Sequence, residues 1–215
     1  MSRRGVFVTG TDTGIGKTFV AACLVRAWGA GYWKPVQTGL AEEPGGDSAT
    51  LARLVDRPGF RPYAPRYQLG APLSPAAAAV LEGVRIALTD FDIPETDGEP
   101  LVVEGAGGVL VPLTDRELIV DLIGRLGLPV ILVARSTLGT INHTLLSLEA
   151  LRARRLPVAG VILNGPPDAG NRAAIERFGA VPVIAVLPRL TAPPGAAAVA
   201  RLAADRIPPL DTILP

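Results

Sequence analysis

The sequence contains almost none of the residues that cross-link a chain or build a metal cage. Its 215 residues include one cysteine, one histidine and one methionine. A single cysteine excludes an internal disulfide and a cysteine-rich metal site. Cys23 falls on the apolar side of a predicted helix, so we expect it to pack in the core rather than act as a nucleophile. His143 has no serine or acid placed with it as a catalytic triad requires, which favours a packing or interface role.

An excess of charge and a long apolar run are also absent. The formal net charge is +1, so no surplus of cations is available to neutralise a nucleic-acid backbone, and no nucleic-acid partner is expected. No uninterrupted apolar run reaches membrane-spanning length, and the N-terminus shows no apolar signal segment. We therefore expect a soluble cytoplasmic protein without a membrane partner. The length and the 48% hydrophobic content suit a single α/β domain over residues 1–215.

Lysine is nearly missing as well. Of the 21 basic residues, only Lys17 and Lys34 are lysines, and the other 19 are arginines. Two lysines retained in an arginine-rich sequence indicate sites that need a compact ammonium group. Both follow short predicted strands, beside turns that contain glycine or proline. The alternative interpretation is codon bias with two incidental lysines.

A phosphate-binding loop is predicted between an apolar strand and a helix. The segment Val6–Thr18 has the sequence VFVTGTDTGIGKT, and a helical pattern begins at its end. Gly14 and Gly16 let the backbone approach an anion, and the first helical turn supplies N–H donors and a positive dipole. In such a loop Lys17 reaches the β- and γ-phosphates and the Thr18 hydroxyl binds Mg²⁺. Five residues separate the first and last glycine, where four are usual, and the alternative is a tight turn that happens to carry a lysine and a threonine.

Two further segments are expected near this loop. Tyr32–Val36 is predicted to be a short strand that Pro35 terminates, with Thr38 just beyond it. Strand ends beside a phosphate loop face the same crevice, so Lys34 and Thr38 are candidate site residues. Asp47 begins the next predicted helix, and without the phosphate-binding loop nearby an N-cap role would be the default interpretation.

An acid ends the next informative strand. The apolar segment Leu101–Glu104 finishes in a carboxylate and is followed by the glycine-rich sequence GAGG. In P-loop proteins this is where the carboxylate that orients Mg²⁺ lies. The alternative is an acidic residue that faces solvent at a strand end.

Strands and helices alternate along the rest of the chain. Further strands are predicted at 129–134, 158–163 and 181–187, and helices at 17–28, 47–55, 76–88, 117–126, 144–154, 171–178 and 195–205. This alternation predicts a doubly wound, mainly parallel sheet of the P-loop NTPase type, with helices on both faces and a ligand crevice at the carboxyl ends of the strands. The helix that follows Ser136–His143 offers N–H groups able to hold a carboxylate.

Five motifs occur in the same order in the dethiobiotin synthetase family, which the chain resembles. They are GTDTGIGKT at 10–18, KPVQTG at 34–39, EGAGG at 104–108, PVILV at 129–133 and LGTINH at 138–143. The resemblance extends from about residue 6 to residue 188, and the five-residue glycine spacing is a feature of that family. Gly14 stands where some members have glutamate, and the segment after Pro188 lacks an acid that some members place near the base.

The resemblance implies ATP-dependent carboxylation and ring closure of 7,8-diaminononanoate with carbon dioxide, giving dethiobiotin, ADP and phosphate. In the family, one amine captures carbon dioxide as a carbamate, the carbamate takes the γ-phosphoryl group to form a carbamic-phosphoric anhydride, and the second amine closes the ring. ATP is thus implied as a substrate and Mg²⁺ as a cofactor. Two anions must be held together, so catalysis rests on positioning and charge neutralisation rather than on a protein nucleophile.

The resemblance also implies a role for each matching residue. Lys17 would stabilise the transferred phosphoryl group, Lys34 would bridge the carbamate and the γ-phosphate, and Thr38 would hydrogen-bond the carbamate. The metal would be held by Thr18, Asp47 and Glu104. The nucleotide would contact Thr13, Gly14, Ile15, Gly16, Lys17, Thr18, Asn164 and Pro188. The diamine would contact Thr11, Lys34, Thr38 and Gly107 and, from the second subunit of a homodimer, Leu138, Gly139, Thr140, Ile141 and Asn142.

A partitioning or switch-type P-loop ATPase that acts through a protein partner is the main alternative. The loop of those proteins carries an extra lysine at the position that Asp12 occupies here. They also end in a basic amphipathic membrane helix, whereas Arg206–Pro215 is short and proline-rich. A small-molecule kinase is a second alternative, and it would phosphorylate its acceptor without carbon dioxide.

Overall fold

A six-stranded parallel sheet forms the centre of the protein. The computed structural model describes residues 4–188 and 194–214. The strand order is β2-β5-β1-β6-β7-β8, and every neighbouring pair is parallel. The strands are β1 (Gly5–Gly10), β2 (Gly31–Trp33), β5 (Leu101–Gly108), β6 (Val130–Arg135), β7 (Val158–Asn164) and β8 (Val183–Leu187). The predicted doubly wound sheet is thereby confirmed.

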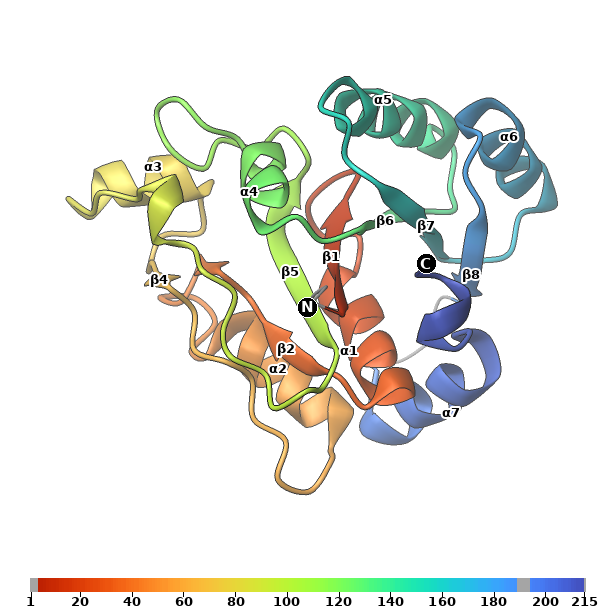
Figure 1. Cartoon of the computed structure of the whole chain (residues 1–215), viewed down its shortest axis with the longest axis horizontal. Helices are drawn as coiled ribbons and strands as arrows, with labels where there is room; N and C mark the ends of the chain where they lie inside the picture. Colours follow the sequence, from red (N-terminus) through yellow and green to blue (C-terminus); the bar gives the residue numbers. More distant parts are fainter. Residues whose placement is uncertain (1–3, 189–193, 215) are drawn as a thin grey trace.

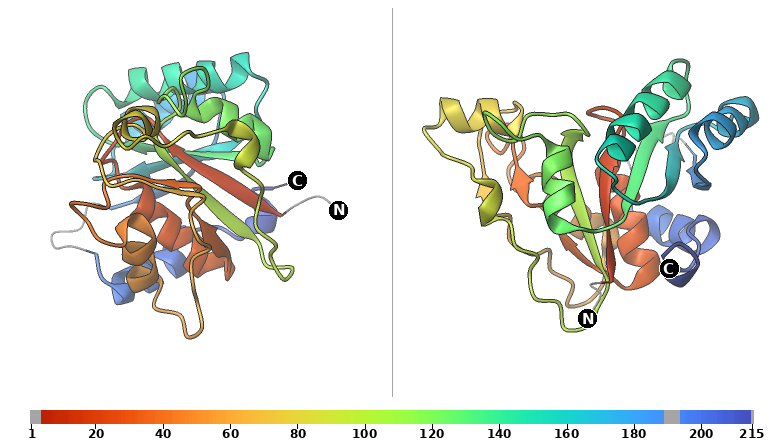
Figure 2. Two further views of the ribbon diagram at one scale, coloured as in Figure 1. Left: turned by 90° about the vertical axis from the view of Figure 1, so that its left-hand side faces the viewer. Right: turned by 45° about the horizontal axis from the view of Figure 1, so that its top comes forward.

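Helices cover both faces of this sheet (Figure 1). One face packs against α1 (Lys17–Trp28), α2 (Gly46–Val55) and α7 (Ala196–Arg206), and the other against α4 (Ile119–Leu126), α5 (Thr140–Ala153) and α6 (Ala169–Gly179). The two further views show the same layering, with α3 (Pro75–Leu81) set beyond the β2 side of the sheet (Figure 2). Short 3-10 turns lie at Leu88–Asp90 and Leu210–Thr212. Within residues 4–188 and 194–214, no helix combines the length and the apolar character needed to cross a bilayer.

Alternating side chains of the strands divide the core into two halves. Val6 and Val8 face the α1 side, whereas Phe7 between them faces the α4 side. Cys23 is fully buried on α1, and burial raises the pKa of its thiol to about 12. The predicted packing role for this cysteine is confirmed, because a thiol with so high a pKa is a poor nucleophile.

The predicted strand Tyr32–Val36 is wrong in its extent. The main-sheet strand β2 ends at Trp33, and the chain then leaves the sheet through Lys34 and Pro35. Two residues farther on, β3 (Val36–Gln37) pairs in parallel with β4 (Tyr67–Gln68) in a separate two-stranded sheet. Proline has no N–H for a ladder, and the Pro35 carbonyl instead accepts hydrogen bonds from the backbone of the 66–67 segment. Lys34 therefore lies at the point where the chain turns away from the sheet.

Two predicted helices differ from the observed ones by four or more residues at one end. The helix predicted at 76–88 stops at Leu81, because Gly83 adopts a φ of +65° and Val84 donates its N–H to the Ala79 carbonyl. This is a Schellman termination, which the left-handed conformation of glycine permits. The helix predicted to begin at Thr144 begins at Thr140, directly after Gly139 with a φ of +90°.

Ala180 gives a stability prediction, because it ends α6 in the left-handed conformation at φ 42° and ψ 49°. Alanine is strained there, whereas glycine is not. We expect Ala180→Gly to raise the free energy of unfolding by about 0.5–1 kcal/mol and the melting temperature by about 2 °C. Ala204→Gly, an exposed change inside α7, should lower stability by a similar amount. Calorimetry that found Ala180→Gly unchanged or less stable would contradict the strain.

Candidate active site

The phosphate-binding loop leaves the carboxyl end of β1 at the centre of the sheet. It runs from Thr11 to Gly16 and delivers Lys17 and Thr18 to the first turn of α1. Gly14 and Gly16 have φ values of +68° and +86°, which explains why both positions are glycine. A side chain at Gly16 would also collide with the Asn164 amide. The Asn164 amide donates to the Ile15 carbonyl at 2.8 Å, so the end of β7 contacts the loop.

A buried group of charges lies beside this loop. The Lys34 ammonium is 2.7 Å from Asp47 Oδ2 and 3.2 Å from Glu104 Oε1. Lys34 and Glu104 are 3% and 1% exposed. Thr18 Oγ1 lies 2.9 Å from Asp47 Oδ1 and 3.0 Å from Glu104 Oε1. A hydroxyl has one hydrogen and donates to only one of the two carboxylates at a time.

The sheet register explains how these side chains meet. Trp33 of β2 is opposite Val103 of β5, so the next residues along the two strands are Lys34 and Glu104. On the other side of β5, Glu104 is opposite Val8 of β1, the strand that leads into the phosphate-binding loop. The carboxyl ends of three adjacent strands thus supply the loop, the lysine and the acid.

Two residues that the sequence did not single out complete this arrangement. The buried Tyr32 hydroxyl donates to Glu104 Oε2 at 2.9 Å. The side-chain carbonyl of Gln37 accepts the Asp47 backbone N–H at 3.0 Å. The default N-cap interpretation of Asp47 is wrong: Gly45 is the N-cap of α2, and the Asp47 carboxylate contacts Lys34 and Thr18 instead. Tyr32 could have been found from strand alternation, which places it on the same side as Lys34.

Burial and neighbouring charges shift the pKa values of the site in different directions. Burial lowers the pKa of Lys34, but the nearby Glu104 and Asp47 carboxylates more than offset it, so the net pKa lies above the usual value. Burial raises the pKa of Asp47, but Lys34, Thr18 and Lys17 together outweigh that effect, so the net pKa lies below the usual value. Burial lowers the pKa of Lys17, with Glu104 acting against it. Opposite charges therefore stabilise the ionised forms of Lys34 and Asp47.

Lys17 is held differently from Lys34. It is 7% exposed, and its ammonium donates to the Asp12 backbone carbonyl at 3.1 Å. A neutral carbonyl is a weaker partner than a carboxylate. Lys17 is therefore the less tightly paired of the two ammonium groups, as suits a side chain that approaches a phosphate.

A cavity of about 330 Å³ opens onto these charges. Its lining includes most of the residues expected to act on the nucleotide and the carbamate, namely Thr13, Gly14, Gly16, Lys17, Thr18, Lys34, Thr38, Asp47, Glu104 and Gly107. Thr11 and Thr13 line a neighbouring cavity of about 290 Å³, together with His143 and Leu146 of α5. The expected residues of the first half of the chain are thus brought to one place.

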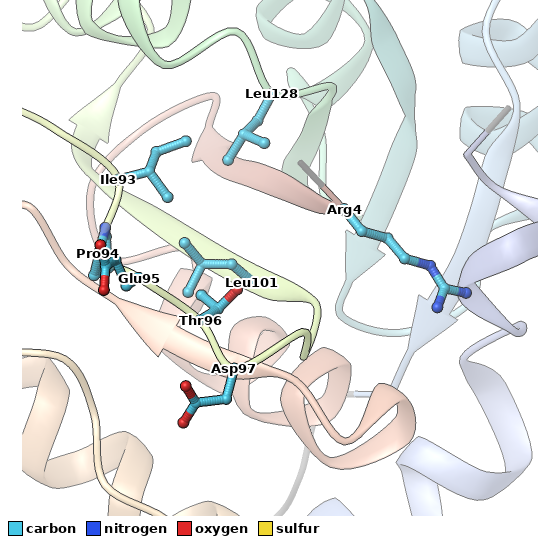
Figure 3. Close-up of a pocket in the computed structure, with 8 residues that line it drawn as sticks. All are labelled: Arg4, Ile93, Pro94, Glu95, Thr96, Asp97, Leu101 and Leu128. Atoms are coloured by element: carbon cyan, nitrogen blue, oxygen red, sulfur yellow. The ribbon is translucent and has the colours of Figure 1, made fainter. Parts of the chain in front are cut away.

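Two larger cavities lie away from these charges. One of about 630 Å³ lies between α3 and the 113–117 turn. Another of about 400 Å³ lies at the amino ends of β1 and β5, where Ile93 and Leu128 face each other and Arg4 extends outward (Figure 3). Neither contains a lysine or any of the expected site residues, so volume alone does not identify the site.

The residues expected from later in the chain lie around this centre rather than in it. Leu138–Asn142 form the turn and first residues of α5 and do not line the cavity that holds the lysines. Leu138 is wholly exposed, whereas Thr140 is buried. Pro188 directly follows β8, whose Leu187 is opposite Asn164. The segment 189–193, where some family members place an acid, lies outside the described residues.

The chemistry of the donor set limits which metals suit the site. Thr18, Asp47 and Glu104 offer only oxygen atoms, which suit Mg²⁺. Within the described part of the chain, no group of three or more His, Cys, Asp or Glu side chains is arranged to hold a metal ion. The three oxygen donors of Thr18, Asp47 and Glu104 suit a hard cation that takes its other ligands from phosphates and water.

Comparison with known proteins identifies the family. A family model described as an AAA domain matches residues 4–193. The ATP-dependent dethiobiotin synthetase BioD of Paramagnetospirillum magneticum is 53% identical over 189 residues, which cover 88% of this chain and 90% of that protein. The chain belongs to the dethiobiotin synthetase family.

Two further comparisons define the limits of this assignment. The biotin biosynthesis bifunctional protein BioCD of Bordetella avium is 61% identical to this chain over 211 residues. The match covers 98% of this chain but only 44% of BioCD, so the chain spans less than half the length of that relative. A ParA family ATPase from Chlorobium tepidum is similar with a TM-score of 0.51 and 12% identity, over 95% of this chain and all of that one. The second likeness shows the shared fold alone.

The hydrogen bond from Tyr32 to Glu104 gives a prediction for the stability of this protein. Tyr32→Phe leaves a buried carboxylate oxygen without its donor, so we expect the free energy of unfolding to fall by about 1.5–3 kcal/mol in urea titrations. Tyr63→Phe is the matched control, because the Tyr63 hydroxyl donates to Glu99 at 3.1 Å near the surface, where water replaces it. That change should cost under about 0.5 kcal/mol. Equal losses in the two variants would show that the buried hydrogen bond contributes no more to the free energy of unfolding than the one near the surface.

Proposed function

We propose that this chain catalyses the ATP-dependent closure of the ureido ring of dethiobiotin from 7,8-diaminononanoate and carbon dioxide, releasing ADP and phosphate. The observation that carries the proposal is the pair of buried lysines beside a phosphate-binding loop, with Lys34 held between two carboxylates. The names of relatives at about 50% identity over most of the chain support the same reaction. We propose further that residues 1–215 act as a single domain.

The reaction needs charge neutralisation more than a nucleophile. One amine of the diamine attacks carbon dioxide and loses a proton to give a carbamate. A carbamate oxygen then attacks the γ-phosphorus and ADP leaves, which forms a carbamic-phosphoric anhydride. The second amine attacks the carbonyl carbon, phosphate leaves, and the ring closes. The second of these steps brings two anions together, so positioned cations lower its barrier most.

We propose for these residues the roles that the family resemblance implies. Lys17 stabilises the transferred phosphoryl group, and Lys34 bridges the carbamate and the γ-phosphate. Thr38 hydrogen-bonds the carbamate, with Thr11 and Gly107 beside the diamine. The nucleotide phosphates bind the backbone from Thr13 to Thr18, and the base lies toward Asn164 and Pro188. The donation from Asn164 to the Ile15 carbonyl supports this last placement, because it joins the end of β7 to the loop.

Thr18, Asp47 and Glu104 would hold Mg²⁺, whose role is to neutralise charge on the β- and γ-phosphates. Their all-oxygen donor set supports this assignment, as does the Thr18 hydroxyl, whose single hydrogen cannot satisfy both carboxylates. Lys34 contacts the same two carboxylates. We infer that its ammonium offsets part of their negative charge.

A homodimer would complete the diamine site. Leu138–Asn142 of one subunit would hold the carboxylate tail of a diamine bound to the other, at the N-terminus of α5. Exposed apolar side chains support an interface here: Leu138 is fully exposed, and Leu110 and Leu146, which line the 290 Å³ cavity, are more than half exposed. Clusters of exposed apolar side chains of this kind mark protein contacts.

The proposed reaction is tested by phosphate release from MgATP, with 7,8-diaminononanoate and bicarbonate each omitted in turn. We expect release to require both, and mass spectrometry to find a product heavier than the diamine by one carbonyl less two hydrogens. A phosphorylated diamine formed without bicarbonate and without phosphate release would indicate a kinase. Release without the diamine would favour a switch-type ATPase and would overturn the proposal.

A further inference from the structure

We propose that Arg135 is a positioning residue for the nucleotide-binding loop and that it acts through Asp12. The proposal rests on the proposed function only in requiring that the loop binds a nucleotide. Arg135 is the last residue of β6, and its Nη2 donates to Asp12 Oδ2 at 2.8 Å. No motif of the sequence joins these two residues, which are 123 positions apart.

Asp12 makes three contacts that link this ion pair to Lys17. One carboxylate oxygen accepts from Arg135, and the other accepts the Thr13 backbone N–H at 2.7 Å. The backbone carbonyl of Asp12 accepts the Lys17 ammonium at 3.1 Å. Holding the Asp12 carboxylate therefore also holds the peptide group on which Lys17 rests.

The sheet register places Arg135 beside a second side chain that contacts the loop. Arg135 is opposite Asn164 at the ends of β6 and β7. Asn164 holds the loop at the Ile15 carbonyl, and Arg135 holds it at Asp12. Between these two points, Gly14 has no atom within 4 Å of the position where a side chain would begin. The loop is thus fixed on both sides of its most open residue.

The positive charge of Arg135 also contributes, because it lies beside the Asp12 carboxylate. Asp12 places a carboxylate beside the loop that is proposed to bind the nucleotide phosphates, and this carboxylate repels the phosphates because both are negative. Arg135 neutralises that carboxylate. The two side chains are 42% and 55% exposed, so their contribution to global stability is small. Loss of Arg135 should therefore weaken nucleotide binding while the protein stays folded.

The test compares ATP binding among three variants, measured with a fluorescent ATP analogue. Arg135→Ala should weaken binding about fivefold. Asp12→Asn removes the repelling charge but keeps an oxygen for the Thr13 N–H. Because Arg135 acts through Asp12, the double variant Arg135→Ala with Asp12→Asn should bind ATP to within about twofold of Asp12→Asn alone. The turnover number at saturating ATP should change less than affinity in all three.

Arg154→Ala is the matched control, because Arg154 pairs with Asp121 at 3.6 Å with similar exposure, between α5 and α4, and should leave ATP affinity unchanged. Unaltered affinity in Arg135→Ala would overturn the proposal. A further loss on removing Arg135 in the Asp12→Asn background would also overturn it, because Arg135 would then contact the nucleotide directly. Since the readout is nucleotide binding, failure of ring closure would leave this result interpretable.

Discussion

The ion pair between Lys34 and Glu104 is the constraint on which the rest of the site depends. Removing a charged group from water costs several kcal/mol unless partners replace the water. Glu104 forms an ion pair with Lys34, accepts a hydrogen bond from Tyr32 and lies within hydrogen-bond distance of Thr18. Lys34 also forms an ion pair with Asp47. These partners come from β2, β5, α1, α2 and the segment after β2. The elements around the cavity therefore assemble together, because each of them supplies a member of this buried network.

The parallel sheet accounts for this convergence. In a doubly wound sheet the loops at the carboxyl ends of adjacent strands meet in one crevice. Here β2, β5 and β1 supply Lys34, Glu104 and the phosphate-binding loop, and β6 and β7 supply the two side chains that hold the loop from the other side. The same register that forms the backbone ladder also sets the distances between the charges.

Local sequence patterns were sufficient for some of these features and not for others. The glycines of the loop and the acid at the end of an apolar strand are visible without the fold, because backbone conformation and burial restrict which residues occur there. Gly83 could have shown where α3 ends, but the apolar run before it hid the signal. The start of α5 at Thr140 was missed because its first turn, TINH, is polar and partly exposed.

Contacts between distant segments could not be predicted from local pattern. The bond from Tyr32 to Glu104 depends on the pairing of β2 with β5, and that from Arg135 to Asp12 depends on the pairing of β6 with β1. Asp47 shows the same limit. A helix start favours an acidic residue for local reasons, and only the packing of α2 against α1 reveals that its carboxylate is used elsewhere.

Lys34 offsets part of the negative charge of Asp47 and Glu104, the carboxylates that we propose as ligands of a divalent cation. The most direct test of this role is Mn²⁺ binding in the absence of nucleotide, measured by electron paramagnetic resonance of the free ion. Lys34→Gln should bind Mn²⁺ about tenfold more tightly than the unmodified protein, because Asp47 and Glu104 lose their shared cation. Lys17→Gln removes an equal charge from the same cavity but touches neither carboxylate, so it should change affinity by no more than about threefold. Equal effects of the two variants, or none from Lys34→Gln, would contradict the account.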